Sequence, residues 1–361
     1  MFYGISIYQT DEYKTEGNIE YIKKAGEIGY NLLFTSLHLP EQSVDFGVIK
    51  EFINVFKIAK AYKMAVIADI SPSILNIFTD LKEFQDIGIN ILRIDYGFSA
   101  DKIAKMTLNK YGINICINAS TVTRILLEEL KKLGADFKRI YASHNFYPRP
   151  ETGLSYRFLL EKSYLCKEYD LPVIAFIPSQ KGKRGPLYEG LPTLEIHRQL
   201  KAELAAKHLL YAGVIDGVVF GDAYASQEEL LKVRAIDPGV IELNIELYPQ
   251  ISDEEKKIVF LPSHTSRLDS PEYIIRSEES RGYARIGVNI KPGHNIERKA
   301  YSVTIDNEMY KRYSGELQIV LKDFPEDERV NVVGRIPDEE YILVNQIKPG
   351  KKFRFTEGRR K

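Results

Sequence analysis

Polar side chains recur at the carboxyl ends of the apolar segments in the first two thirds of the chain. They are acids, amides and imidazoles, and they include His38, Asp69, Asp95, Asn118, His144, Asn145 and Asp222. In a barrel of parallel strands these ends meet at one mouth, which is where catalytic groups lie. One such residue alone is more often a helix cap or a turn former. Several together at the same ends predict a functional site.

A proline-containing segment at residues 144–154 presents further polar side chains. It reads HNFYPRPETGL and contains Tyr147, Arg149 and Glu151. Two prolines stiffen its backbone, so these side chains would be held at low entropic cost. The alternative is a proline-rich surface turn without a ligand. We expect the segment to contribute to substrate binding.

A second segment, at residues 178–192, has the composition of an anion site. Its cations Lys181, Lys183 and Arg184 lie among glycines, and Tyr188 and Glu189 follow them. Arginine can bind an oxyanion through two parallel hydrogen bonds, and glycine lets backbone N–H groups approach it. Barrels often bind phosphate near the loops after strands 7 and 8. The pattern favours a phosphorylated substrate over a merely solvated run of charges.

Acids near a phosphate site point to glycosyl transfer. One carboxylic acid can protonate the leaving oxygen while a second carboxylate attacks the sugar or activates water. The candidate carboxylates are Asp69, Asp95, Glu151, Glu189 and Asp222. Among them we favour Asp95 paired with Asp222 or with Glu151 as catalytic residues. The other carboxylates, Asn118 and the polar residues of the two segments are assigned to substrate binding.

Two other chemistries fit the sequence less well. A Schiff-base aldolase needs a lysine inside the barrel, whereas Lys138 lies at the wrong end of its strand and Lys181 lies in a loop. A metal site needs clustered imidazoles, and only His38 and His144 fall at the reactive ends. We therefore expect no metal and no cofactor.

Eight short apolar segments predict the strands that must position these residues. They lie at residues 2–8, 31–37, 65–70, 90–95, 114–119, 139–144, 172–177 and 216–221. Most are continuously apolar, as strands covered on both faces are, which indicates a parallel sheet. Amphipathic helical patterns separate them, and glycines such as Gly29 and Gly134 mark helix ends. The alternation predicts a (β/α)₈ barrel over residues 1–238. No G-x-G-x-x-G follows a strand, which argues against an open doubly wound sheet.

The hydrophobic pattern changes near Asp237-Pro238-Gly239. From there apolar residues alternate with period two, for example at Val303 and Ile305, and turn-forming Pro-Gly pairs recur. A short helical turn is expected at residues 253–257. We expect a second, small all-β domain over residues 239–361.

Composition excludes several classes of protein. The chain has 361 residues with 50 Lys and Arg against 50 Asp and Glu, so its formal net charge is zero. This argues against binding to nucleic acid or to an anionic membrane surface.

No apolar run approaches the ~20 residues that span a bilayer. Two isolated cysteines and the lack of a signal peptide pattern lead us to expect a cytoplasmic protein. A homo-oligomer stays possible.

Six segments resemble the 6-phospho-N-acetylmuramidase family, some members of which are labelled "outer surface protein". They are GISIY at 4–8, FTSL at 34–37, RIDYGF at 93–98, NAST at 118–121, HNFYPRPETGL at 144–154 and GKRGPLYEGLPTLE at 182–195. The resemblance extends over the whole chain and is most specific in the two long segments. It implies a (β/α)₈ barrel followed by a cyclophilin-like β-barrel.

The resemblance also implies an activity and a substrate. The expected reaction is cytoplasmic hydrolysis of the disaccharide N-acetylmuramic acid 6-phosphate–N-acetylglucosamine in the recycling of cell-wall peptidoglycan. The cations at 181–184 and Arg149 would suit its phosphate and its lactyl carboxylate. Two alternatives stay open: an isomerase, epimerase or lyase acting on a sugar phosphate in the same barrel, and a non-catalytic protein that binds a phosphorylated ligand.

Overall fold

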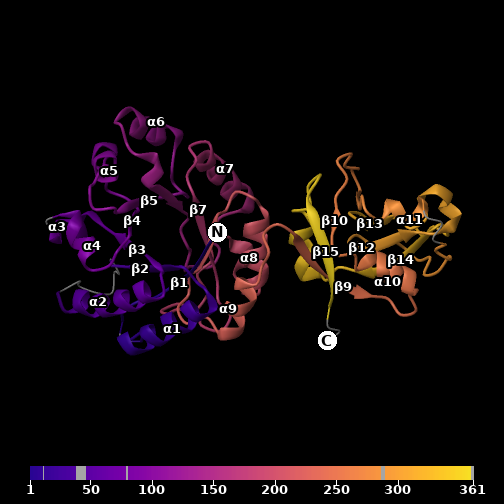
Figure 1. Cartoon of the computed structure of the whole chain (residues 1–361), viewed down its shortest axis with the longest axis horizontal. Helices are drawn as coiled ribbons and strands as arrows, with labels where there is room; N and C mark the ends of the chain where they lie inside the picture. Colours follow the sequence, from indigo (N-terminus) through magenta and orange to yellow (C-terminus); the bar gives the residue numbers. More distant parts are fainter. Residues whose placement is uncertain (11, 38–45, 79, 286–288, 359–361) are drawn as a thin grey trace. The chain divides into compact units, whose positions relative to one another are not determined.

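The chain folds into two compact units, Met1–Ile236 and Asp237–Lys361, shown in Figure 1. A computed structural model describes all residues except 11, 38–45, 79, 286–288 and 359–361. It also leaves the side chains of residues 46–50, 76, 77, 284 and 285 undescribed. The division falls at the Asp-Pro-Gly segment where the hydrophobic pattern changes.

The first unit is a closed barrel of eight parallel strands. These are β1 (Phe2–Ser6), β2 (Leu32–Ser36), β3 (Ala65–Ile70), β4 (Ile91–Ile94), β5 (Asn114–Asn118), β6 (Ile140–Ser143), β7 (Val173–Ile177) and β8 (Gly217–Phe220). Each strand pairs with the next in the sequence, and β1 pairs with β8 to close the sheet. This confirms the predicted barrel and excludes the open sheet.

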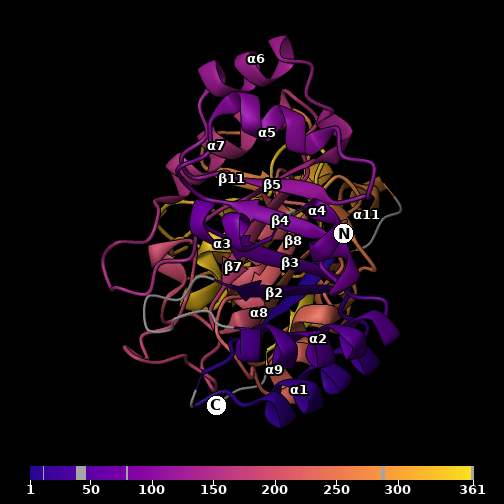
Figure 2. The ribbon, with the colours of Figure 1, turned by 90° about the vertical axis from the view of Figure 1, so that its left-hand side faces the viewer.

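Helices surround the strands of this unit, as Figure 2 shows. They are α1 (Thr15–Ile28), α2 (Phe46–Ala61), α3 (Pro72–Ile77), α4 (Leu81–Asp86), α5 (Ala100–Thr107), α6 (Arg124–Lys132), α7 (Tyr156–Lys167), α8 (Ala202–Tyr211) and α9 (Gln227–Arg234). Gly29 ends α1 with a φ of 98°, a left-handed conformation that costs glycine little. Gly134 follows α6 with a φ of 75°. The glycines therefore stop the helices as predicted.

Apolar side chains from the strands fill the barrel interior. Leu32, Phe34, Ile67 and Phe176 belong to one buried cluster there, together with Cys116. Burial raises the pKa of the Cys116 thiol to about 12, so it stays protonated and unreactive at neutral pH. The packed interior leaves the strand ends as the place for a site.

The second unit is built on a curled seven-stranded sheet with short helices. Its strands are β9 (Ile241–Leu247), β10 (His264–Thr265), β11 (Ile274–Arg276), β12 (Ser302–Asp306), β13 (Leu317–Val320), β14 (Val330–Arg335) and β15 (Lys352–Glu357), in the order β10-β15-β9-β14-β12-β13-β11. Its helices are α10 (Asp253–Val259), α11 (Arg281–Arg285) and α12 (Tyr341–Val344). Val303, Ile305 and Ile319 are buried, as their period-two pattern predicts.

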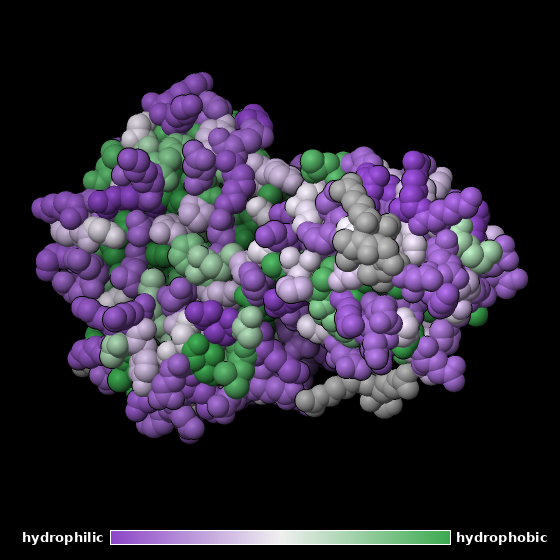
Figure 3. Space-filling view, turned by 45° about the vertical axis from the view of Figure 1, so that its right-hand side comes forward, coloured by the Kyte–Doolittle hydropathy of each residue, from purple (hydrophilic) through white to green (hydrophobic). Residues whose placement is uncertain are grey.

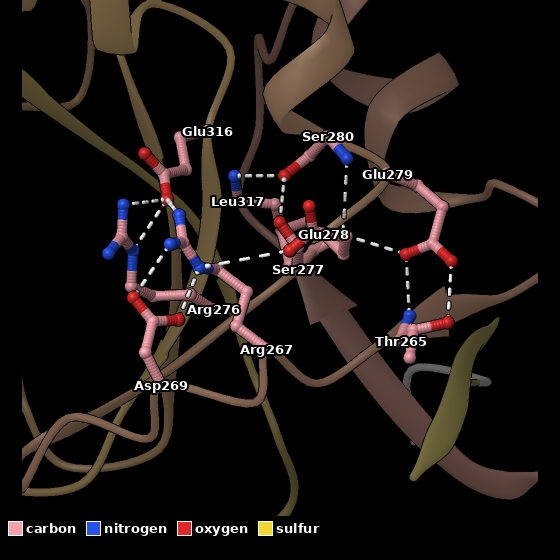
Figure 4. A network of polar contacts seen from close by, with 10 residues as sticks. All are labelled: Thr265, Arg267, Asp269, Arg276, Ser277, Glu278, Glu279, Ser280, Glu316 and Leu317. Carbon is pink, nitrogen blue, oxygen red and sulfur yellow. Dashed lines mark hydrogen bonds and ion pairs between the residues drawn. The ribbon is translucent and has the colours of Figure 1, made fainter. Parts of the chain in front are cut away.

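A polar network joins β11 and the start of β13 in this unit (Figure 4). Glu316 has a side chain only 1% exposed and accepts a hydrogen bond of 2.5 Å from Arg276 Nε. Arg267 Nη1 lies 3.8 Å from the same carboxylate, and Arg267 Nη2 lies 2.7 Å from Asp269 Oδ2. Two arginines thus compensate one buried carboxylate, which otherwise would be costly to desolvate.

Asp306, at the end of β12, should make stability depend on pH. Burial, with the charge of Glu316 added, raises the pKa of Asp306 from 3.8 to about 8. The folded state therefore holds this proton more tightly than the unfolded state, and the free energy of unfolding falls as pH rises from about 4 to about 8. Asp306→Asn should remove that fall. We expect its stability relative to the wild type to rise by more than about 1 kcal/mol between pH 5 and pH 8. Thermal or urea unfolding at both pH values measures this, and an equal difference at both would contradict it.

Hydrophilic side chains cover most of the face of each unit that Figure 3 shows, with hydrophobic ones in small groups among them. In the part of the chain that the structure describes, no helix is both long and apolar enough to cross a membrane.

Candidate active site

A cavity of about 460 Å³ opens at the carboxyl ends of the barrel strands. Its wall comes from β2, β3, β4 and β7 and from the two segments that follow β6 and β7. The charged residues that line it are Asp69, Arg93, Asp95, Arg184 and Glu189. Phe146, Phe176 and Leu187 supply apolar surface. A cavity of this size and mixed lining is typical of a small-molecule site.

Arg93, on β4, is the one charged lining residue that is buried, with a side chain 4% exposed. Its Nη1 lies 2.7 Å from Asp69 Oδ1, and its Nη2 donates to Asn145 Oδ1. Because the guanidinium group is planar and rigid, it fixes the orientation of both side chains. Arg93 therefore holds Asp69 and Asn145 in place on the cavity wall.

Asp95 follows β4 and is exposed toward the cavity. Asn118 Nδ2 donates to Asp95 Oδ1 at 2.5 Å, while Asn118 Oδ1 accepts from the N–H of Ser120 at 2.8 Å. Because that N–H identifies the oxygen end of the amide, its nitrogen must face Asp95. One carboxylate oxygen is thus held by the protein, and no described residue donates to the other.

Arg184 lies across the face of Tyr8. Its Cζ is 3.9 Å from the ring centroid, within the range of a cation–π contact. Tyr8 is fully buried and its hydroxyl donates to the carbonyl of Gly221 at 2.7 Å, so the ring is a fixed platform. Arg184 makes no ion pair with any residue that the structure describes. Its charge is therefore available to an anion in the cavity.

Asp222 organises the segment after β7. Its Oδ2 accepts from the N–H groups of Ser179 and Leu191 at 2.9 and 3.1 Å, and its Oδ1 accepts from the N–H of Arg184 at 2.9 Å. The residue is fully buried. Nearby, a Cβ on Gly182 would overlap the backbone carbonyl oxygens that follow β8, so only glycine fits there. These contacts fix the course of the segment that carries Arg184 and Glu189.

Arg198 ties the two long segments together. Its side chain is 5% exposed, and its Nε and Nη2 lie 2.6 and 2.7 Å from the carboxylate of Glu195. Nη1 donates to Gly190 O at 3.0 Å, and Nη2 donates to Tyr147 O at 3.0 Å and to Arg149 O at 3.2 Å. The hydrogen bonds that Arg198 donates to Glu195 lower the pKa of this carboxyl group to about 2. The cavity is therefore bounded by segments held together through a buried arginine.

Asp222→Asn should destabilise the chain rather than remove a reacting group. Its amide nitrogen would face backbone N–H donors and leave at least one of them unpaired. We expect the free energy of unfolding to fall by about 1–3 kcal/mol, measured by urea unfolding. Glu151→Gln, at an exposed position, should change it by less than about 0.5 kcal/mol. A stable but inactive Asp222→Asn protein would contradict this and assign Asp222 to the chemistry.

Comparison with known protein families identifies the chain. Family models described as 6-phospho-N-acetylmuramidase, N-terminal and C-terminal, match residues 3–235 and 241–356. The chain belongs to the 6-phospho-N-acetylmuramidase family. The resemblance found in the sequence is therefore confirmed.

Two solved structures are similar to this family member over nearly its whole length. An uncharacterized B. cereus protein has 34% sequence identity and a TM-score of 0.90, with 99% of each chain covered. A conserved Enterococcus faecalis protein of unknown function has 35% identity and a TM-score of 0.72, with 99% of this chain and 97% of that chain covered. No curated protein matches.

The cavity of this family member gathers some of the residues expected from sequence. Asp69, Asp95, Asn145, Arg184 and Glu189 line it. Asn118 lies behind Asp95 as its hydrogen-bond donor. Asp222 lies at a strand end, but its carboxylate accepts from three backbone N–H groups and it is not among the residues that line the cavity.

Six other residues expected from the sequence are not among the described residues that line the cavity. Glu151, Arg149 and Lys181 are exposed, and Lys183 and Tyr147 are half-buried. Tyr188 is 54% exposed and its hydroxyl donates to Glu12 Oε2 at 3.1 Å. The structure gives none of these six a place on the wall. The cationic run is thus divided, with Arg184 alone among its members facing the cavity.

His144 is buried rather than available to a substrate. Its Nδ1 lies 3.2 Å from Ser120 Oγ and its Nε2 lies 2.9 Å from Ser163 Oγ. Burial lowers the pKa of His144 to about 3, so the ring is neutral. His38 lies outside the described residues. Among the residues that are described, no group of three His, Cys, Asp or Glu side chains could hold a metal.

Sequence reasoning missed Arg93 and Arg198 as organisers of the site. A signal for Arg93 was present, because a charge inside the apolar run of β4 must find a partner. Arg198 follows Glu195 by three residues, the spacing of an ion pair on a helical turn.

Proposed function

We propose that this chain hydrolyses the glycosidic bond of N-acetylmuramic acid 6-phosphate–N-acetylglucosamine. One observation carries the proposal: a single cavity is lined by Arg184, which makes no ion pair with any described residue, and by the carboxylates Asp95 and Glu189. Membership of the 6-phospho-N-acetylmuramidase family supports the same reaction. In this proposal the reaction is part of peptidoglycan recycling in the cytoplasm.

Arg184 is the proposed phosphate ligand. A guanidinium group can donate two parallel hydrogen bonds to a phosphate, and the Tyr8 ring fixes its plane. Desolvation of the arginine against a buried ring strengthens its attraction to an anion. The Arg93–Asp69 pair, already neutralised, is better suited to hydrogen-bond sugar hydroxyls than to bind a second charge.

Asp95 and Glu189 are the proposed catalytic residues. Hydrolysis needs one carboxyl group to protonate the glycosidic oxygen and a second to attack the anomeric carbon or activate water. Asp69 forms an ion pair with Arg93, so we assign it to substrate binding rather than to catalysis. Asp95 accepts an amide N–H from Asn118, which suits the nucleophile or base, and Glu189 is then the proton donor. This pair replaces the combinations of Asp95 with Asp222 or Glu151.

The reaction is tested by its products. The full chain is incubated with the phosphorylated disaccharide, and mass spectrometry follows both sugars. We expect free N-acetylglucosamine and N-acetylmuramic acid 6-phosphate in equal amounts. Consumption of substrate with the disaccharide bond intact, as an isomerase or epimerase would give, or with release of lactate, as a lyase would give, would contradict the proposal. So would binding without turnover.

A further inference from the structure

A second, smaller cavity of about 90 Å³ adjoins the proposed site. It lies between α5 and α6, and Asp95 lines both cavities. Its wall is mainly apolar, from Phe98, Ile103, Val122 and Leu126. We call this space the Asp95 crevice. It opens beside the carboxylate assigned to the anomeric carbon.

The polar groups of the Asp95 crevice lie at one side. Asp95 presents a carboxylate oxygen to which no described residue donates, and Asn118 and Thr121 complete the polar edge. No lysine or arginine occurs among the described residues that line it. An anionic substituent would meet an uncompensated carboxylate there, which is unfavourable. A neutral group with one N–H donor and an apolar end fits both parts of the lining.

We propose that the Asp95 crevice binds the N-acetyl group of the muramyl sugar. This rests on the proposed function, which places Asp95 near the anomeric carbon. The acetamido group is carried by the next ring carbon, so it lies within reach of the same carboxylate. Its N–H faces the hydroxyl of Thr121 at the polar edge, and its methyl enters the apolar part between Ile103 and Leu126. The Asp95 oxygen to which no described residue donates is then left to face the anomeric carbon.

The substrate's other substituents fit this space less well. The lactyl group and the phosphate are anions, and no described cation lines the Asp95 crevice to pair with either of them. The volume of about 90 Å³ also suits a short acyl group better than a long one. The crevice thus makes acyl length a determinant of specificity.

The first test enlarges the crevice. Leu126→Ala removes carbon atoms from its wall, and Ile125→Ala, at a position 81% exposed on the same helix, is the matched control. The substrates are the phosphorylated disaccharide and a version with N-butanoyl on the muramyl sugar. A methylene in an apolar pocket changes kcat/KM by about 10–200-fold. We expect the wild type and Ile125→Ala to prefer N-acetyl at least about tenfold, and Leu126→Ala to lose most of that preference.

The second test fills the crevice from an exposed position. Thr121→Phe should lower kcat/KM on the N-acetyl substrate by at least about tenfold, and on the free-amine analogue by less than about threefold. Equal effects on both substrates, or an unchanged acyl preference in active Leu126→Ala, would overturn the crevice assignment alone. Failure of the wild type to cleave any of these disaccharides would overturn the proposed function and this inference with it.

Discussion

Glu189→Gln is expected to lower kcat on the phosphorylated disaccharide by about 10²–10⁴-fold, the usual cost of losing general acid–base catalysis. Glutamine keeps the shape of the side chain but cannot give a proton to the glycosidic oxygen. Asp95→Asn should cost a similar factor, because the amide cannot attack the anomeric carbon or activate water. Substrate binding should change much less, so the loss should appear in kcat rather than in KM.

Steady-state kinetics of N-acetylglucosamine release measures both variants. Glu151→Gln is the matched control, because Glu151 was also a sequence candidate but is exposed and does not line the cavity as described. It should retain activity within about threefold. Activity within about tenfold of the wild type in both Glu189→Gln and Asp95→Asn would refute the carboxylate assignment.

Arg184→Ala is expected to lower kcat/KM on the phosphorylated disaccharide by at least about 30-fold. Removing one partner of a desolvated charge pair costs about 2–5 kcal/mol, and every 1.4 kcal/mol is a factor of ten. The same change should cost less than about threefold on the unphosphorylated disaccharide, which has no charge to pair at that position. The ratio of the two values of kcat/KM therefore measures phosphate recognition directly.

Lys181→Ala is the control for nearby charge. Lys181 belongs to the same basic segment, but it is exposed and is not among the described residues that line the cavity. It should change both substrates by less than about threefold, because exposed charges are screened by solvent. Equal losses on both disaccharides in Arg184→Ala, or a larger phosphate-specific loss in Lys181→Ala, would show that the phosphate lies elsewhere.

The barrel could be predicted because local and global signals agree. Strands such as β7 are continuously apolar, and glycines such as Gly29 stop the helices between them. A barrel places all strand ends at one mouth, so Asp69 and Asp95 could be assigned to a common site from sequence. The apolar strand segments and the glycines at helix ends are local sequence patterns. Tertiary contacts did not change the secondary structure that these patterns predict.

The direction of individual side chains could not be predicted in the same way. Asp95 and Asp222 both follow strands, yet one faces the cavity and the other caps three backbone N–H groups. Lys181 and Arg184 are three residues apart, and only Arg184 meets the ring of Tyr8. These differences arise from contacts between distant segments, including those of Arg198, which sequence spacing does not specify.

We propose that one cavity binds the phosphate through Arg184 and holds the anomeric carbon between Asp95 and Glu189. A crystal structure of the Glu189→Gln protein with the phosphorylated disaccharide bound tests it most directly. We expect phosphate oxygens within hydrogen-bond distance of the Arg184 guanidinium and a carboxylate oxygen of Asp95 facing the anomeric carbon. A phosphate bound by Lys181 and Lys183 at the surface, with the sugar ring outside the cavity, would contradict it.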